Sequence, residues 1–294
     1  MKVAFLGFGL IGGSVARALR ERGPDEGAVP TVITAWSPSG RGPSAAVLDG
    51  IVDVAATSPQ AAIEAAELVV LAGPPGVCLD MLDDLAGAWR SALLPDAVIT
   101  DVASTKAAIV LRATALGLRF VGGHPMAGRE SSGYGAATSD LFIDRPWVIV
   151  PGADERAVAR VEALATAVGA HLVRLSASAH DQAVAGISHL PLITSAALVE
   201  AVAGSRQAPR EDWAEAQSVA ASGWRDMTRL ARGDIDMGAG IATTNAVALA
   251  RRIRDLMAVL DGWAGELERP GGPDPDAIRG RFERARAVLE ASER

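Results

Sequence analysis

The hexapeptide Gly7-Phe8-Gly9-Leu10-Ile11-Gly12 directly follows the apolar run at residues 3–6 and begins a segment rich in alanine, leucine and arginine. This context predicts a strand, a tight turn and a helix. The first glycine permits the turn, the second lets a diphosphate approach the backbone, and the third lets the helix pack close to the strand. We therefore expect Gly7, Gly9, Leu10, Ile11 and Gly12 to bind a dinucleotide with its diphosphate at the helix N-terminus. A glycine-rich turn without a ligand is the alternative.

Six further short apolar runs follow along the chain, with stretches of helical periodicity between them. They lie at residues 32–35, 68–72, 98–101, 120–122, 147–150 and 172–175. Their hydrophobicity is continuous rather than alternating, which is typical of strands covered on both faces of a parallel sheet. The N-terminal half is therefore predicted to be α/β, with a Rossmann-type, mainly parallel sheet.

After about residue 176 the pattern becomes helical. The segments 180–203, 212–232 and 240–264 are rich in alanine and leucine at helical spacing, and a last helix is expected after Pro273-Asp274-Pro275. Breakers at 204–209 and 270–275 separate these helices, and residues 23–30 are expected to form a surface loop. We predict two domains, residues 1–175 for the dinucleotide and the catalytic loops, and an all-helical domain at 176–294.

Composition restricts the classes of partner. The chain has 294 residues and a formal net charge of −7, from 28 basic and 35 acidic residues, without a long basic block. Nucleic acid is therefore not an expected partner. The single cysteine, Cys78, excludes an intramolecular disulfide framework and fits a reducing compartment. No stretch is persuasive as a membrane span, so we expect a cytoplasmic protein.

The end of the second predicted strand bears on the choice of cofactor. It reads Ala35-Trp36-Ser37-Pro38-Ser39-Gly40-Arg41, without the carboxylate that often binds the adenosine ribose of NAD. Hydroxyls such as that of Ser37, together with Arg41, suit a 2′-phosphate instead. We expect NAD or NADP as the cofactor and favour NADP.

Unusual residues gather at three successive strand ends, where open α/β sheets bind their ligands. Gly73-Pro74 follows one run and is expected to contact the cofactor, residues 101–106 follow the next, and residues 122–130 the third. His124 is the candidate general base, because a neutral imidazole can accept a hydroxyl proton while hydride leaves the same carbon. Ser104 is expected to orient the imidazole or the substrate hydroxyl.

Lys106 and Glu130 are candidates for substrate contact near the same strand ends. A solvated lysine, and a helix cap or surface charge for Glu130, are the alternatives at these two positions. A lone histidine in a loop is more often structural, but the flanking glycines and the strand-end position favour the catalytic interpretation of His124.

The helical half adds two histidines and two arginines. His180 and His189 are nine positions apart, which in a regular α-helix places them on opposite faces, so they are not expected to act together. Pro191 predicts a kink that exposes His189 toward a pocket. Arg225 and Arg229 lie one turn apart, and either suits a carboxylate, with surface salt bridges as the alternative. No pair of residues has metal-ligand spacing, so no metal is expected.

These motifs in this order resemble the prephenate/arogenate (cyclohexadienyl) dehydrogenase family of tyrosine biosynthesis. The resemblance runs from residue 1 to about residue 260. It rests on Asp101-x-x-Ser104-x-Lys106, Gly123-His124-Pro125-Met126-Ala127-Gly128-x-Glu130-x-x-Gly133, Leu141-Phe142, His180-Asp181, Ser188-His189-Leu190-Pro191 and Arg225-Asp226-Met227-Thr228-Arg229.

The resemblance implies oxidative decarboxylation of a cyclohexadienyl acid, with conversion of prephenate to 4-hydroxyphenylpyruvate as the first candidate and arogenate as the other. By the same resemblance, His124 takes the ring hydroxyl proton and Ser104 orients it. Arg229 binds a substrate carboxylate, His189 lines the pocket and Glu130 gates access. The family also implies a homodimer formed chiefly through the helical domain.

The sequence departs from the family pattern at two places. Leu192 stands where the family often has a second histidine, and Gly238 stands where it often has a tryptophan. A substrate with a modified ring, such as an amino-substituted prephenate, is therefore an alternative. A β-hydroxyacid dehydrogenase or imine reductase is a second alternative, and a protein that binds the nucleotide without turnover is a third.

Overall fold

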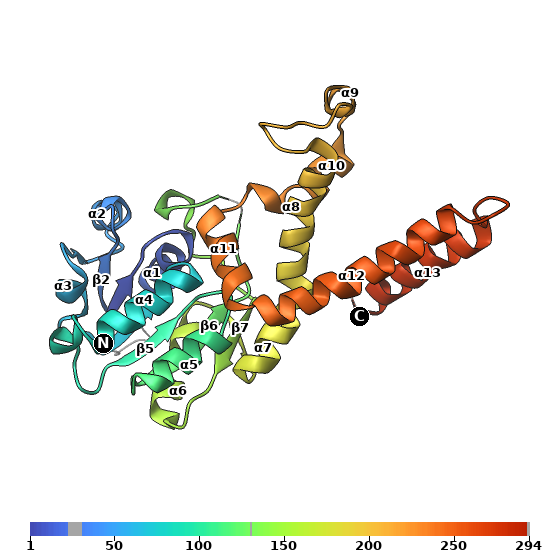
Figure 1. Ribbon diagram of the computed structural model, residues 1–294. Coiled ribbons are helices and arrows are strands. Elements are labelled where there is room, and N and C mark those ends of the chain that lie inside the picture. The colour runs from blue at the N-terminus through green and yellow to red at the C-terminus, as the bar shows by residue number, and fades with distance from the viewer. Residues whose placement is uncertain (23–30, 130, 293–294) are drawn as a thin grey trace. The chain divides into compact units, whose positions relative to one another are not determined.

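A computed structural model of the chain describes residues 1–22, 31–129 and 131–292 (Figure 1). The predicted loop at 23–30 and the predicted gate Glu130 lie outside the described residues. The chain divides into two compact units, Met1–Ala248 and Leu249–Arg294. The domain boundary at residues 175 and 176 stays a prediction.

Eight strands form one sheet in the order β3-β2-β1-β4-β5-β6-β7-β8. Neighbouring strands from β3 to β6 pair in parallel, β7 pairs antiparallel with β6, and β8 pairs parallel with β7. The mainly parallel sheet is confirmed, and all seven predicted runs are strands. The strands are β1 (Lys2–Leu6), β2 (Val32–Trp36), β3 (Val54–Ala55), β4 (Leu68–Leu71), β5 (Val98–Asp101), β6 (Phe120–Pro125), β7 (Pro146–Val150) and β8 (His171–Arg174).

Each face of this sheet is covered by a separate hydrophobic core. Val3 and Phe5 of β1 point into one core with residues of α1 (Leu10–Arg22) and α6 (Glu155–Ala167). Ala4 and Leu6 point into the other core with residues of α3 (Pro59–Ile63), α4 (Pro75–Ala86) and α5 (Ala107–Ala115). Successive side chains of a strand alternate between faces, so a strand that is covered on both sides must be apolar throughout. This explains why the strands are continuous apolar runs.

The helices of this part follow the strands in alternation. Asp154 caps α6, because its carboxylate accepts hydrogen bonds from the backbone N–H groups of Arg156 and Ala157. The helical elements are α1 (Leu10–Arg22), α2 (Arg41–Leu48), α3 (Pro59–Ile63), α4 (Pro75–Ala86), η1 (Arg90–Ala92), α5 (Ala107–Ala115), η2 (Tyr134–Ala136) and α6 (Glu155–Ala167).

The remaining described chain is helical, as predicted, but it is more broken than its periodicity suggests. The predicted helix at 212–232 is three short pieces, and the one at 240–264 is interrupted at Asn245, whose side chain makes buried hydrogen bonds. The elements are α7 (Ala177–Val184), η3 (Ala185–His189), α8 (Leu190–Ala203), α9 (Trp213–Ser218), α10 (Ser222–Met227), η4 (Leu230–Arg232), α11 (Ile235–Thr244), α12 (Ala246–Leu267) and α13 (Pro275–Ser292).

Two pairs of helices that involve this part can be described locally. α11 lies against the start of α4, where a Cβ added to Gly240 would come 3.0 Å from Pro75 Cδ. In the second unit, Trp263 of α12 packs on Phe282 of α13 with ring centroids 5.2 Å apart, and the guanidinium of Arg281 lies 4.8 Å from the centroid of the Trp263 ring. An α-helical hairpin is thereby held by aromatic and cation–π contacts.

Candidate active site

The glycine loop, residues 7–12, has the geometry that a dinucleotide requires. Gly7 has a φ of +88°, and a Cβ there would lie 2.5 Å from the carbonyl oxygen of Ala72. A Cβ on Gly12 would lie 3.1 Å from the carbonyl oxygen of Gly7. A Cβ on Gly9, in contrast, would meet no atom within 4 Å. The loop is therefore closed toward the protein and open at the helix N-terminus, which fits a diphosphate.

Two other segments beside this loop carry predicted cofactor contacts. Ser37 follows β2 and is half-buried, and Arg41 is exposed as the first residue of α2. Gly73 and Pro74 are half-buried between β4 and α4. All of these residues lie at the carboxyl ends of adjacent parallel strands, which is the ligand-binding edge of such a sheet.

His124 lies near the carboxyl end of β6, next to β5. The close approach of these strands depends on Gly123, because a Cβ there would lie 2.6 Å from the carbonyl oxygen of Asp101. Ser104, on the segment that leaves β5, is half-buried. The two predicted catalytic residues therefore extend from adjacent strand ends.

A buried ion pair lies next to the strand ends that carry His124 and Ser104. The Lys106 ammonium pairs with Asp101, and both side chains are fully buried. Asp101 Oδ1 also accepts a hydrogen bond of 3.1 Å from the backbone N–H of Gly123, the neighbour of His124. The lysine that was a candidate for substrate contact is thus directed at an internal carboxylate.

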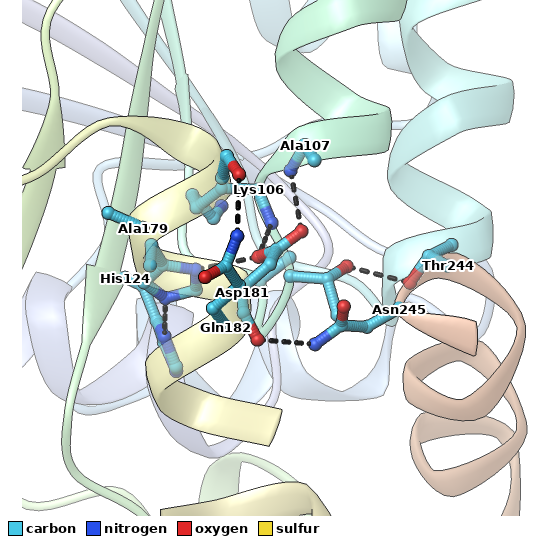
Figure 2. Close-up of polar contacts among 12 residues, drawn as sticks. Lys106, Ala107, His124, Ala179, Asp181, Gln182, Thr244 and Asn245 are labelled. Carbon is cyan, nitrogen blue, oxygen red and sulfur yellow. Dashed lines mark hydrogen bonds and ion pairs between the residues drawn. The ribbon is translucent and has the colours of Figure 1, made fainter. Parts of the chain in front are cut away.

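A chain of three side chains connects His124 to the start of α5 (Figure 2). His124 Nδ1 lies 2.8 Å from His180 Nε2, and His180 Nδ1 lies 2.7 Å from Asp181 Oδ1. Asp181 in turn accepts hydrogen bonds of 2.7 and 2.8 Å from the backbone N–H groups of Lys106 and Ala107. The helix N-terminus thereby holds a carboxylate that orients a histidine pair.

His189, the last residue of η3, joins the same group of residues eight positions after Asp181. The side-chain nitrogen of Asn245 lies 2.8 Å from the backbone oxygen of Asp181 and 3.1 Å from His189 Nδ1. The buried His189 Nε2 has no hydrogen-bond partner among the described residues. We call the seven residues that are linked or packed here the polar junction: Asp101, Lys106, His124, His180, Asp181, His189 and Asn245.

The prediction that His180 and His189 point to opposite faces of a regular helix and do not act together is wrong in its geometry, since both are fully buried members of the polar junction. The reason is local. Residues Ala185–His189 form a π-helical turn immediately before Pro191. A π-turn takes about one residue more per turn than an α-helix, and this changes the direction in which the second histidine points.

Burial governs the protonation of the two histidines that carry predicted roles. Burial, reinforced by His180, Lys106 and His189, lowers the pKa of His124 well below its usual value. Burial also lowers the pKa of His189 to about 4, with Asp181 opposing the shift. Burial alone would raise the pKa of Asp181, but the hydrogen bonds from His180 and the two backbone N–H groups outweigh it and hold that pKa below its usual value. At neutral pH His124 is therefore a neutral base that is linked to a charged carboxylate through His180.

The two arginines that were predicted to bind a carboxylate are not members of the polar junction. Arg225 and Arg229 are exposed, on α10 and just before η4. The backbone N–H of Ala231 donates a 3.0 Å hydrogen bond to Ser195, six residues beyond His189 on α8. This contact places the arginine segment alongside α8, roughly 9 Å along the helix axis from His189. Among the described residues, no group of three metal-binding side chains is present.

Four members of the polar junction had no predicted role: Asp101, His180, Asp181 and Asn245. The His180-Asp181 dipeptide sits in the first turn of α7, which Ser176 caps by accepting a hydrogen bond from the N–H of Ala179. That dipeptide was the one local signal. Its partners are 56 to 75 positions away in the sequence, so spacing alone does not reveal them.

Comparison with known proteins gives matches along most of the chain. The family model described as prephenate dehydrogenase, nucleotide-binding domain, matches residues 15–174. The model described as prephenate dehydrogenase, dimerization domain, matches residues 176–270. A prephenate dehydrogenase of Bacillus subtilis is 32% identical over 272 residues, which is 91% of this chain and 68% of that protein.

Solved structures agree with these matches. The arogenate dehydrogenase of Synechocystis is 31% identical with a TM-score of 0.72, covering 100% of this chain and 98% of the other. The prephenate dehydrogenase of A. aeolicus, in complex with hydroxyphenyl propionate and NAD+, is 25% identical with a TM-score of 0.79, covering 100% of this chain and 96% of the other.

Proposed function

The chain belongs to the prephenate dehydrogenase family, and from that premise we propose how its own residues carry the reaction. It is an NAD(P)-dependent oxidoreductase of the prephenate dehydrogenase type. We propose prephenate as the substrate, with oxidative decarboxylation to 4-hydroxyphenylpyruvate for tyrosine biosynthesis. The observation that carries this proposal is the buried, neutral imidazole of His124 at the same edge of the sheet as the glycine loop.

In this reaction the ring hydroxyl loses its proton, the carbon that bears it loses a hydride, and the ring carboxylate leaves as CO2. Its bonding electrons make the ring aromatic, and the resulting phenolate oxygen regains a proton to give the phenol. His124 accepts the hydroxyl proton, which its lowered pKa permits at neutral pH. A bound nicotinamide would supply the hydride acceptor. Ser104, on the neighbouring strand end, orients the hydroxyl.

Other side chains bind the acid. Arg229 binds a substrate carboxylate, with Arg225 one turn away, because a guanidinium suits a carboxylate by its two parallel N–H donors. His189 lines the pocket with Nε2, the nitrogen that lacks a partner among the described residues. Glu130 gates access. We assign Lys106 a supporting role rather than a direct contact, because its ammonium is buried on Asp101.

For the cofactor we propose a preference for NADP over NAD. The end of β2 offers the hydroxyls of Ser37 and Ser39 and the guanidinium of Arg41, and no carboxylate. Dissociation constants of NAD+ and NADP+ test this preference, with Arg41→Ala as the variant that weakens NADP+ alone. A strong preference of the unchanged protein for NAD+ would refute it.

We also propose a cytoplasmic homodimer formed through the helical domain. Ala177–Ala203 is long and apolar enough to cross a membrane by length and composition. Its buried His180, Asp181, His189 and Ser195, however, hydrogen-bond or pack within the protein, so a second copy is the more suitable cover for its exposed apolar side chains. Sedimentation of the purified protein without detergent tests this, and a soluble monomer contradicts it.

The substrate is tested by following nicotinamide absorbance at 340 nm with prephenate, arogenate and, as a negative control, 3-hydroxyisobutyrate. We expect turnover of prephenate. Exclusive turnover of arogenate would leave the proposed oxidative decarboxylation in place, but it would show that the enzyme recognises the amino-acid side chain of arogenate instead of the keto-acid side chain of prephenate. Cofactor binding without turnover of either cyclohexadienyl acid would overturn the proposed function.

The base is tested by His124→Asn, which removes the proton acceptor. We expect turnover to fall by roughly 100-fold or more with little change in cofactor affinity. Arg229→Ala is the matched variant for binding, and it should mainly raise KM. Normal kinetics in both variants would show that these roles are wrong.

A further inference from the structure

The direction of the hydrogen bonds in the polar junction is set by the Asp181 carboxylate. Its two oxygens accept hydrogen bonds from the backbone N–H groups of Lys106 and Ala107 at the start of α5. Backbone N–H groups can only donate, and they stabilise the ionised form of a carboxyl group. Asp181 is therefore an acceptor toward every neighbour, His180 included.

This fixes the proton of His180. Because Asp181 Oδ1 accepts, His180 Nδ1, at 2.7 Å, is the nitrogen that carries the hydrogen. A neutral imidazole has one N–H and one lone pair, so His180 Nε2 carries the lone pair. That lone pair faces His124 Nδ1 at 2.8 Å, and His124 Nδ1 must then be the donor.

We propose that His180 and Asp181 are positioning residues that hold His124 in the tautomer with the proton on Nδ1, so that Nε2 is the basic nitrogen. The catalytic consequence of this tautomer rests on the proposed function, whereas the assignment of the tautomer does not depend on it. Asp181 orients the ring of His180, and His180 in turn orients the ring of His124.

The proposal requires a neutral His180 whose Nδ1–H donates to Asp181. The charged or titratable groups that face His124 are His180 from α7, Lys106 from the start of α5 and His189 from η3. The Lys106 ammonium is paired with the Asp101 carboxylate, and Asp181 is a second carboxylate of this buried group. A protonated His180 would place a second positive charge there and would donate to His124 Nδ1, leaving Nε2 with the hydrogen and without basicity.

The same chain of bonds serves the protonated state. When His124 gains a proton on Nε2, its Nδ1–H still donates to His180, and His180 Nδ1–H still donates to Asp181. The negative charge of Asp181 thus acts on the new imidazolium through one intervening ring, and no proton has to move to the carboxylate. The two rings are held at an interplanar angle of 73°, with centroids 5.0 Å apart.

The tautomer is measurable without substrate. The protein has four histidines, so 15N labelling of histidine gives four ring pairs, which single substitutions assign. At pH 7.5 we expect His124 and His180 each to show a protonated Nδ1 and an unprotonated Nε2. A protonated His124 Nε2, or a doubly protonated His180, would overturn the proposal.

Paired variants separate positioning from simple stability. His180→Ala removes the acceptor for His124 Nδ1–H, and we expect kcat to fall roughly 10-fold or more, because the competing tautomer is then populated. His180→Gln provides an amide oxygen that accepts the same hydrogen bond, and it should restore most of kcat and the Nδ1–H signal. His171→Gln, at an exposed position on β8, is the matched control and should change neither.

The outcomes distinguish this proposal from the proposed function. If no cyclohexadienyl acid is turned over but the His124 tautomer is as expected, the proposed function fails and the positioning role stands. If prephenate is turned over and His124→Asn is inactive, but His180→Ala retains both the tautomer and kcat, the positioning role fails alone. Equal loss in His180→Ala and His180→Gln with an unchanged tautomer in both would also overturn it.

Discussion

The glycine loop and the polar junction lie at one edge of the same sheet and are built in opposite ways. The glycine loop is one hexapeptide that would bind its ligand through the backbone. Its close contacts with the protein are possible because Gly7 and Gly12 have no side chain. The polar junction uses charged and polar side chains from β5, the start of α5, β6, α7, η3 and the residue between α11 and α12, all of them buried. The glycine loop leaves room for a ligand next to its backbone. The polar junction instead provides hydrogen-bond or charge partners for most of its buried side chains.

This difference has an energetic consequence. A buried polar group costs free energy unless each partner is present, so the polar junction is sensitive to the loss of any one member. The glycine loop is sensitive only to added atoms. Substitutions that remove a group should therefore damage the polar junction, and substitutions that add a group should damage the loop.

The largest expected effect on stability is that of Asp101→Asn. This substitution leaves the Lys106 ammonium buried without its counter-charge. Removal of one partner of a buried pair costs about 3–5 kcal/mol, and we expect a fall of that size in the free energy of unfolding measured with urea.

The matched control is the double variant Asp101→Asn with Lys106→Met, which removes both charges. Replacement of a complete buried pair is often nearly neutral, so most of the lost stability should return. If the single variant is as stable as the unchanged protein, the ion pair does not support the strand end.

The next effect concerns the glycine loop. Gly7→Ala places a side chain at a φ of +88° and brings Cβ within 2.5 Å of the carbonyl oxygen of Ala72. Strain of this kind costs about 1–3 kcal/mol, which thermal unfolding should show. Gly9→Ala adds the same methyl group where no protein atom lies within 4 Å, so it should retain stability and lose cofactor affinity instead. A reversed ranking of the two variants in thermal stability would contradict the geometry of the loop.

The third effect is a dependence of stability on pH. Burial holds the pKa of His189 at about 4, below the value of about 6.5 for an unfolded histidine. The unfolded chain therefore binds more protons below about pH 6.5, and the free energy of unfolding falls as the pH drops from there toward 4. His124 acts in the same direction. We expect His189 alone to account for a loss of about 2 kcal/mol between pH 7 and pH 5, and His189→Gln should remove that part of the slope.

The smallest effect tests a link between the two regions. Tyr134 follows the strand of His124, stacks on Phe8 of the glycine loop with ring centroids 5.5 Å apart, and donates a 2.8 Å hydrogen bond to Asp49. Tyr134→Phe keeps the ring and removes the hydroxyl. Because Asp49 is exposed, we expect a loss of at most about 1 kcal/mol. A loss of unfolding free energy as large as that expected for Asp101→Asn would mean that the Tyr134–Asp49 hydrogen bond matters as much for stability as the polar junction does, which would contradict this prediction.

Most of the sheet was predictable because its signals are local. The run at 98–101 coincides with β5, and the hexapeptide identified the loop, since strand, turn and helix are adjacent in the chain. β3 was missed because two residues, Val54 and Ala55, carry no pattern. The C-terminal helices were predicted too long, because their interruptions depend on tertiary contacts such as those of Asn245.

The candidate site was predictable in part for the same physical reason. His124 was identifiable from its glycines and its strand end. The pairing of His124 with His180 was not, because it joins residues 56 positions apart, and because the π-turn before Pro191 changes the helical phase. Lys106 was a candidate for substrate contact, yet its ammonium is buried on Asp101, which its position in the sequence does not reveal.

The central claim is that His124 acts as the base beside a bound nicotinamide. It is tested most directly by a crystal structure of the protein with NADP+ and a 4-hydroxyphenyl product analogue. The account predicts His124 Nε2 within hydrogen-bond distance of the phenolic oxygen, with His180 on its other nitrogen and the cofactor diphosphate on the glycine loop. A ring of His124 turned away from the ligand, with another group on the phenolic oxygen, would contradict it.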